Sequence, residues 1–311
     1  MAHRVFIDGA AGTTGIEIHD RLAGRSEFEL IVLGDDERKS EAARRDALHA
    51  ADVAILCLPD DAAREAVALA EGSDTRFIDA STAHRVAEGW TYGFPELVGR
   101  DAVASAHRVS NPGCYPTGFL ALVAPLVRAG LLPADWPYTV NAVSGFSGGG
   151  KALIERFEGD PSIGFRAYGL GLGHKHLPEM RKYAGLTHEP VFSPSVIPAM
   201  RGMVVDVPLP LAAMKVSATG GELHAALSAF YSGSEIVSVH SLADQPGELL
   251  LSTDAAAWDG LELFVFGAAD GAQARLIARL DNLGKGASGA AVQSLNLMCG
   301  LPETAGLNLT A

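Results

Sequence analysis

A cysteine that follows an Asn-Pro-Gly sequence is the residue of this 311-residue chain best suited to nucleophilic chemistry. Cys114 ends that turn and precedes an apolar helix expected over residues 119–127. Backbone N–H groups and the dipole at the start of a helix favour the thiolate, which is the reactive form of cysteine. Cysteines are more often buried and inert, but a core position would not need this turn. We therefore predict that Cys114 is a nucleophile.

Two histidines placed two positions apart, His174 and His176, could serve such a thiolate. In an extended segment their side chains project from one face, an arrangement that also suits a metal ion. The sequence offers no third His or Cys nearby at ligand spacing, so we predict no metal site. The alternative is that one histidine donates and accepts protons for the thiolate chemistry, oriented by a carboxylate such as Glu179.

Three glycines with the spacing GxxGxxG, Gly9, Gly12 and Gly15, follow a strand expected over residues 4–8 and open a helix expected over residues 14–22. Glycines permit a tight turn, and the N–H groups at the start of the helix can then face a pyrophosphate. The spacing differs from the commoner GxGxxG, and a purely structural turn is the alternative. The strand–turn–helix context favours a dinucleotide site.

The turn after the second expected strand (residues 28–33) contains charges of both signs. Asp35 and Asp36 could hold a ribose hydroxyl, which favours NAD. Arg38 and Lys39 could accommodate the 2′-phosphate of NADP. A solvated turn without a ligand is equally compatible with this composition, so these residues alone leave the cofactor open.

A loop rich in serine and glycine, residues 144–150, follows another expected strand and is followed by Lys151. Its spacing does not match the GxxxxGK[ST] phosphate loop. The hydroxyl and N–H groups of Ser144 and Gly145 could still bind a phosphate or carboxylate. Arg201, between two expected strands, could bind a carboxylate through two N–H groups.

Strands and helices alternate in the first third of the chain, which predicts a mainly parallel, doubly wound α/β sheet. The further elements expected there are helices over residues 40–50 and 62–70 and strands over residues 53–58 and 77–80. From residue 138 onward few βαβ units are evident, which predicts an α+β domain with a mixed or antiparallel sheet. Its expected elements are strands over residues 139–143, 204–208, 236–239 and 261–267, a helix over 222–231, and a last helix over 286–299.

The formal charge of −13 comes from 37 acidic against 24 basic residues, which argues against binding to nucleic acid. The three cysteines form neither a CxxC pair nor a disulfide framework, which favours a reducing compartment. Cys57 and Cys299 lie in apolar segments and are interpreted as structural. No stretch resembles a signal peptide or a transmembrane helix, so we expect a cytoplasmic protein that does not bind membranes.

Together these motifs resemble those of the N-acetyl-γ-glutamyl-phosphate reductases of arginine biosynthesis, and the chain length is similar to that of their shorter form. The matching segments extend over the whole chain and comprise residues 9–15, 92–97, 111–117, 144–150, 174–179, 201–203, 281–289 and 300–304. The departures are a compressed region between residues 34 and 52 and Lys151 after the glycine loop. The first leaves the contacts to the 2′-phosphate unassigned.

The resemblance implies reduction of an acyl phosphate through a covalent intermediate. The Cys114 thiolate would attack N-acetyl-glutamyl phosphate, expel phosphate and form a thioester. NADPH would then deliver hydride, and the thiohemiacetal would collapse to N-acetyl-glutamate semialdehyde. His176 would be the acid and base, by its match to the second histidine of the family motif.

The resemblance also implies a Rossmann-type NADP-binding domain of residues 1–114 and 286–311, and a catalytic and dimerisation domain of residues 115–285. NADP(H) would be bound by Gly9, Gly12, Thr13, Thr14, Gly15, Arg38, Lys39, Ser81, Asn282, Lys285 and Gly286. The substrate would be bound by Ser144, Gly145, His174, Lys175, Glu179 and Arg201. The expected assembly is a homo-oligomer, either a dimer or a tetramer.

Three other functions are compatible with parts of this pattern. A thiol hydrolase or acyltransferase would use Cys114 and His176 but would not need the glycine turn. A noncatalytic NADP-binding sensor would need the glycine turn but not the cysteine. Aspartate-semialdehyde dehydrogenase uses the same covalent strategy, and within the enzyme class it is the alternative.

Overall fold

The computed structural model describes residues 2–34 and 36–310, and the chain divides into two compact units. The first unit contains the chain up to Gly113 together with Ala287–Leu307. The second unit contains Cys114–Gly286 and the short stretch that starts at Asn308. Cys114 is therefore the first residue of the second unit, and each unit is described separately below.

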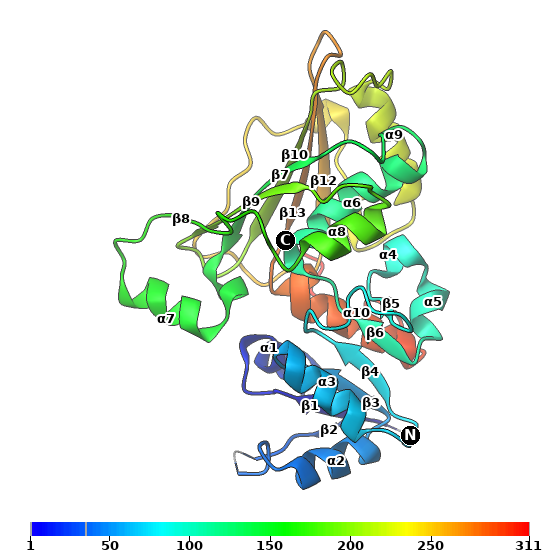
Figure 1. The fold of residues 1–311 in the computed structure, drawn as a ribbon, viewed down its shortest axis with the longest axis vertical. Coiled ribbons are helices and arrows are strands. Elements are labelled where there is room, and N and C mark those ends of the chain that lie inside the picture. The colour runs from blue at the N-terminus through cyan, green and yellow to red at the C-terminus, as the bar shows by residue number, and fades with distance from the viewer. Residues whose placement is uncertain (1, 35, 311) are drawn as a thin grey trace. The chain divides into compact units, whose positions relative to one another are not determined.

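The first unit is an open sheet of six parallel strands with the order β2-β1-β3-β4-β6-β5 (Figure 1). Its strands are β1 (His3–Asp8), β2 (Phe28–Ile31), β3 (Val53–Leu56), β4 (Arg76–Asp79), β5 (Thr91–Tyr92) and β6 (Arg108–Ser110). Its helices are α1 (Thr13–Leu22), α2 (Glu41–Ala50), α3 (Asp60–Leu69), α4 (Pro95–Val98), α5 (Arg100–Ala104) and α10 (Gly289–Met298). The predicted doubly wound parallel sheet is confirmed.

Two apolar clusters, one on each side of the central strands, hold this sheet. In β3, Val53 and Ile55 belong to one cluster with residues of α1 and α10, whereas Ala54 and Leu56 belong to the other with residues of α2 and α3. A strand covered on both faces is apolar throughout, which explains why this strand was readily recognised in the sequence.

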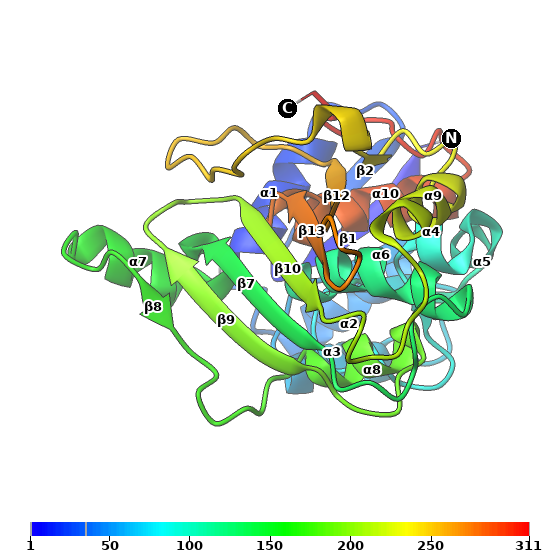
Figure 2. The ribbon, with the colours of Figure 1, turned by 90° about the horizontal axis from the view of Figure 1, so that it is seen from above.

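The second unit is a seven-stranded mixed sheet with the order β11-β12-β13-β10-β7-β9-β8. Its strands are β7 (Thr139–Gly145), β8 (Arg166–Ala167), β9 (Val191–Ile197), β10 (Met203–Leu209), β11 (Val237–Val239), β12 (Leu261–Gly267) and β13 (Ala274–Leu280). Its helices are α6 (Cys114–Arg128), α7 (Lys151–Gly159), α8 (Leu177–Ala184) and α9 (Gly220–Phe230), with short 3-10 turns at Phe146–Gly149 and Leu242–Asp244. The predicted mixed sheet is confirmed, and Figure 2 shows β9, β7 and β10 side by side.

Helices α6 and α9 pack on one face of this sheet. Gly118 of α6 lies so close to β10 that an added Cβ would come within 2.7 Å of a Val205 methyl group. Side chains alternate along a strand, so Asp206 of β10 projects from the other face.

Three strands of the second unit, β8, β9 and β13, were not expected from the sequence, and the regular part of the last helix is shorter than expected. Strand β9 contains Pro194, which weakens a strand pattern because proline cannot donate a ladder hydrogen bond. The segment Gly284–Ser288 is π-helical, and the regular helix α10 begins only at Gly289. The expected helical segment over residues 286–299 is therefore confirmed, with a π-helical turn before its regular part.

Candidate active site

Cys114 is the first residue of α6, and not part of a turn that precedes a helix starting near residue 119. Every residue from Tyr115 to Leu126 is buried, so α6 is a central helix of the second unit. Pro116 does not interrupt the helix because the first N–H groups of a helix have no intrahelical partner. The thiol is half-buried at a helix N-terminus, a position that favours a thiolate.

The two histidines lie in a turn at the start of α8, where His176 is the N-cap residue with φ −87° and ψ −14°. The expectation of an extended segment was therefore wrong, because α8 begins at Leu177 directly after it, with Pro178 in its first turn. The backbone N–H of His176 donates to His174 Nδ1 at 3.2 Å, and the ring centroids are 4.7 Å apart. His176 is 6% exposed. Glu179, predicted to orient a histidine, is fully buried in the first turn of α8.

Two tyrosines connect the cysteine helix to this histidine turn. Tyr115, next to Cys114, lies 5.9 Å from the His176 ring and 6.3 Å from the His174 ring, measured between centroids. The Tyr168 hydroxyl donates to the Tyr115 hydroxyl at 3.2 Å, and Tyr115 donates to the Ser195 carbonyl at 3.4 Å. Burial is the main cause that raises the pKa of both phenols, that of Tyr168 to about 12, so both hydroxyls remain protonated. Tyr115 and Tyr168 therefore pack against the histidine rings. The sequence did not identify either tyrosine as a site residue.

The serine- and glycine-rich loop folds back on the segment that contains Arg201. Gly145 N–H donates to the Gly202 carbonyl at 2.8 Å, and the Ser147 N–H donates to the Met200 carbonyl at 3.2 Å. Ser144 is buried, and its hydroxyl donates to the Gly145 carbonyl at 3.0 Å. Gly145 thus lies against the Arg201 backbone, where an added Cβ would come within 2.8 Å of the Arg201 nitrogen.

Asp281 holds Arg201 in place. The Arg201 Nη1 donates to the buried Asp281 carboxylate at 2.9 Å, and the backbone N–H groups of Trp258 and Leu283 donate to the same carboxylate at 3.3 and 2.9 Å. The Asp281 carbonyl also accepts the Gly286 N–H at 3.0 Å. Asp281 belongs to the motif of residues 281–289, but no pattern in the sequence indicated a role for this residue.

The segment after Asp281 approaches the nucleophile. A Cβ added to Gly286 would come within 2.9 Å of the Cys114 Cβ. Asn282 is 1% exposed, its Nδ2 donates to the Ser147 hydroxyl at 2.8 Å, and its Oδ1 has no hydrogen-bond partner among the described residues. A buried amide oxygen without a partner fits a bound group that donates a hydrogen bond. Lys285 is also buried in this segment.

The glycine turn of the first unit is closed tightly by its backbone. Gly9 has φ +91°, and a Cβ there would lie 2.4 Å from the Cys57 carbonyl oxygen. A Cβ on Gly15 would lie 2.4 Å from the Gly9 carbonyl oxygen, so the turn closes tightly onto α1. Helix α1 begins at Thr13 after the N-cap Gly12, which provides no side-chain cap. The first N–H groups of the helix can therefore bind a pyrophosphate.

The turn between β2 and α2 contains the charges predicted to select the cofactor. Arg38 and Lys39 are exposed there, whereas Asp35 lies outside the described residues. Arg44 of α2 instead makes a buried ion pair, donating from Nε and Nη2 to one oxygen of Asp8 at 3.1 and 3.0 Å. Arg44 thus fixes the end of β1 beside the glycine turn.

The remaining cysteines are poorly placed for nucleophilic chemistry. Burial is the main cause that raises the pKa of the Cys57 thiol to about 12 and that of Cys299 to about 11. Both thiols therefore stay protonated at neutral pH. Among residues 2–34 and 36–310, there is no group of three or more His, Cys, Asp or Glu side chains that could hold a metal ion. No helix in the same residues is long and apolar enough to cross a membrane.

Comparison with known families matches both units. A model described as "Semialdehyde dehydrogenase, NAD binding domain" matches residues 4–106, and one described as "Semialdehyde dehydrogenase, dimerisation domain" matches residues 114–282. An aspartate semialdehyde dehydrogenase II from Vibrio cholerae has a similar fold, with a TM-score of 0.68 at 17% identity over 96% of this chain and 98% of that chain. The corresponding enzyme from Francisella tularensis has a TM-score of 0.68 at 13% identity over 96% of this chain and 100% of that chain.

Curated relatives are much closer in sequence. An N-acetyl-gamma-glutamyl-phosphate reductase from Trichormus variabilis is 48% identical over 98% of this chain and 99% of its own length. A protein of the same name from Brucella ovis is 51% identical over 96% of this chain and 100% of its own length.

Proposed function

The chain belongs to the N-acetyl-γ-glutamyl-phosphate reductase family, and we propose that it reduces N-acetyl-glutamyl 5-phosphate to N-acetyl-glutamate 5-semialdehyde and phosphate, a step of arginine biosynthesis. One structural observation supports this proposal more than any other. Cys114 is the first residue of a buried helix, and it lies in the same unit as a histidine pair and an arginine held by a buried carboxylate. A thiol, a proton carrier and an anion-binding group are the parts that acyl transfer to cysteine requires.

The reaction begins at the sulfur atom of Cys114. The thiolate attacks the carbonyl carbon of the acyl phosphate, the C–S bond forms, and the C–O bond to phosphate breaks, which gives a thioester and inorganic phosphate. Bound NADPH supplies the hydride that reduces this thioester. The C–S bond of the resulting thiohemiacetal then breaks, which releases the aldehyde and restores the thiolate.

His176 is proposed as the residue that manages protons during these steps. Its ring is buried at the start of α8, and its backbone is held by His174 Nδ1. His176 would accept the proton of the Cys114 thiol and donate a proton to the oxygen that becomes negatively charged during reduction. It would take that proton back when the C–S bond breaks and the aldehyde forms. Lys175, His174 and Glu179 are the neighbouring residues proposed to bind or orient the substrate.

The substrate's charged and polar groups have distinct proposed partners. Arg201 would bind the α-carboxylate, and Ser144 and Gly145 would contribute polar groups to the same pocket. An acetamido group needs neutral donors, whereas the ammonium of an aspartyl substrate needs a carboxylate. Asp281, the carboxylate beside Arg201, already accepts hydrogen bonds from Arg201, Trp258 and Leu283. Because these groups already occupy the Asp281 carboxylate, it is not available to pair with the ammonium of an aspartyl substrate. The contacts of Asp281 therefore support the acetylated substrate.

NADP(H) is proposed to bind to the first unit, with its pyrophosphate at the glycine turn. Gly9, Gly12, Thr13, Thr14 and Gly15 would surround the pyrophosphate. The exposed Arg38 and Lys39 would contact the 2′-phosphate. The further cofactor contacts proposed are Ser81, Asn282, Lys285 and Gly286.

A dimer is the proposed minimal assembly, and the second copy would dock on the face of the second-unit sheet opposite α6 and α9. The match to a dimerisation domain covers this sheet. The face contains the exposed ion pair Asp206–Arg275 and a hollow of about 610 Å³. The side chains of Leu170 and Leu172, which line the hollow, are 80% and 66% exposed. Contiguous exposed apolar side chains are typical of interaction surfaces.

Replacement of Leu170 and Leu172 by Asp should shift the mass measured by sedimentation towards the monomer. The matched control is Phe230→Asp on α9, the helix that packs on the other face. If the double variant had the mass of a dimer, the wild-type protein would be a tetramer that uses this face for one of its interfaces. An unchanged mass would contradict the proposed face.

The proposed activity is tested most directly in the reverse direction, as phosphate-dependent reduction of NADP⁺. N-acetyl-glutamate semialdehyde should be used roughly a hundredfold more efficiently than aspartate semialdehyde, because a buried unpaired ammonium is costly. Comparable efficiencies, or a preference for the shorter aldehyde, would instead assign the chain the activity of an aspartate-semialdehyde dehydrogenase. Omission of phosphate is the control.

A further inference from the structure

We infer that His84 is a positioning residue for the cofactor. By pairing with the buried Asp79, it fixes the turn formed by Ser81, Thr82 and Ala83 after β4, where the nicotinamide half of the dinucleotide would bind. The inference rests on the proposed function, since it requires a bound dinucleotide. His84 and Asp79 have no role in the reaction derived above.

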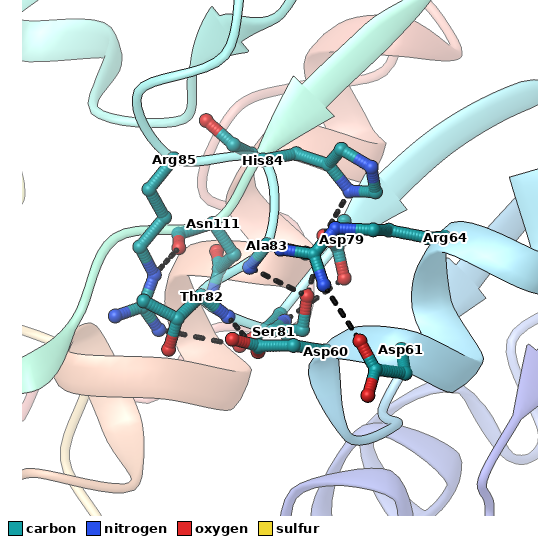
Figure 3. A network of polar contacts seen from close by, with 12 residues as sticks. Asp60, Asp61, Arg64, Asp79, Ser81, Thr82, Ala83, His84, Arg85 and Asn111 are labelled. Carbon is teal, nitrogen blue, oxygen red and sulfur yellow. Dashed lines mark hydrogen bonds and ion pairs between the residues drawn. The ribbon is translucent and has the colours of Figure 1, made fainter. Parts of the chain in front are cut away.

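Asp79 is the centre of this network (Figure 3). It is the last residue of β4 and is fully buried. One carboxylate oxygen accepts the Ser81 N–H at 2.9 Å. The other accepts the Ser81 hydroxyl at 2.7 Å and His84 Nδ1 at 2.6 Å. A carboxylate only accepts hydrogen bonds, so the His84 proton lies on Nδ1 in this pair.

The His84 ring is held by two contacts: Nδ1 pairs with Asp79, and the face of the ring packs on Trp90. It stacks on Trp90, with the ring centroids 4.1 Å apart and the planes 10° from parallel. Trp90 itself packs against the apolar cluster that includes Phe77 of β4. The His84 side chain is only 12% exposed. An uninterrupted series of contacts therefore runs from the apolar core through Trp90 and His84 to Asp79.

The same turn is bound at two further points. The Ser81 hydroxyl accepts the Ala83 N–H at 3.1 Å, and the Thr82 N–H donates to the Asp60 carboxylate at the start of α3 at 2.9 Å. Because Ser81 donates its hydroxyl proton to Asp79, that proton is not available to a ligand. The shape of the turn, more than the Ser81 hydroxyl, would therefore determine how the cofactor is held.

The order of the strands places this turn beside one half of the cofactor. The sheet has the order β2-β1-β3-β4, so the direction of strand addition reverses between β1 and β3. A dinucleotide binds across such a reversal at the carboxyl ends of the strands, with its adenosine over the β2 side. The nicotinamide half then lies over the β3 and β4 side, where Asp79 ends its strand.

The test is a comparison of two ligands that differ in the nicotinamide half. NADPH and 2′,5′-ADP, which lacks that half, are titrated calorimetrically into the full chain. His84→Ala should weaken NADPH roughly tenfold, the scale of one hydrogen bond to a charged group. Binding of 2′,5′-ADP should change by less than about twofold, because its contacts lie elsewhere. In turnover assays KM for NADPH should rise more than kcat falls.

Conservative variants separate positioning from a general loss of structure. In His84→Asn the side-chain amide nitrogen replaces Nδ1 and should restore much of the NADPH affinity, whereas His84→Gln should not. The matched control is His19→Ala, which removes an exposed histidine–carboxylate pair with Asp20 and should change neither ligand.

Equal weakening of both ligands by His84→Ala, no weakening of either, or equal rescue by Asn and Gln would each overturn the inference. Wild-type protein that binds neither ligand would instead overturn the proposed function, and the inference with it.

Discussion

The two candidate binding regions of this protein are assembled differently. In the first unit, the residues proposed to hold the pyrophosphate come from a single strand–turn–helix segment, residues 8–15. In the second unit, the candidate active-site residues are joined to one another by contacts between segments that are distant in the chain. They are Tyr115, Ser144, Ser147, Tyr168, His174, His176, Arg201, Asp281, Asn282 and Gly286.

This difference has a consequence for mutation. A short local turn is shaped by its own backbone. Replacement of a side chain beside such a turn should therefore alter only the ligand contact of that side chain. A site built from distant segments shares its contacts: Asp281, for example, binds Arg201 through its side chain and Gly286 through its backbone. Residues in such networks have coupled effects on function.

Replacement of the nucleophile should have the largest effect. Cys114→Ser should lower kcat by roughly a thousandfold or more, because serine offers no comparable anion at neutral pH and a covalent nucleophile is lost. NADPH affinity, measured by fluorescence, should be unchanged, since the proposed pyrophosphate contacts lie in the first unit. A rate near that of the wild type would exclude the thioester mechanism.

The histidine pair should divide its effects between rate and binding. His176→Asn should lower kcat roughly a hundredfold, in the range of general acid–base contributions. His174→Asn should mainly raise KM, because the amide oxygen of asparagine can still accept the His176 N–H in place of Nδ1. Steady-state kinetics on both variants would check this. The opposite ranking would assign proton transfer to His174.

Changes in the first unit should affect only the cofactor. Arg38→Ala combined with Lys39→Ala should raise KM for NADPH roughly tenfold more than KM for NADH, because a charge-assisted contact to the 2′-phosphate is lost. Arg45→Ala is the matched control, since its exposed pair with Glu41 lies on α2 just beyond this turn. Equal losses for the two cofactors would mean that Arg38 and Lys39 are only solvated.

The smallest effect on activity is expected at the other thiols. Cys57→Ala and Cys299→Ala should change kcat by less than about twofold, as neither thiol has a role in the proposed reaction. Their raised pKa values, about 12 and about 11, mean that each thiolate forms only as the pH rises towards these values. Iodoacetamide at neutral pH should therefore label Cys114, and Cys299 should react before Cys57 as the pH increases. Mass spectrometry of the labelled peptides would show the order.

Much of the first unit could be predicted from the sequence because its signals are local. The strand before Gly9 and the apolar run of β3 have patterns that do not depend on distant contacts. The helix after Ser40 is signalled by a residue whose hydroxyl accepts the Ala43 N–H, a cap that the chain supplies within one turn. The motif around Cys114, residues 111–117, is also a local signal, because its resemblance to a known family is visible within one short segment.

Only the tertiary structure revealed how the polar groups are distributed. His84 and Asp79 had no signal in the sequence, because a histidine near a carboxylate is common and only burial beside Trp90 makes the pair specific. The tyrosine contact between Tyr115 and Tyr168 joins two segments that no local pattern relates. The sequence determined which chemical groups are present and where the chain turns. Tertiary packing decided which of them are buried together, because the free energy of a buried polar group depends on partners that the rest of the fold brings to it.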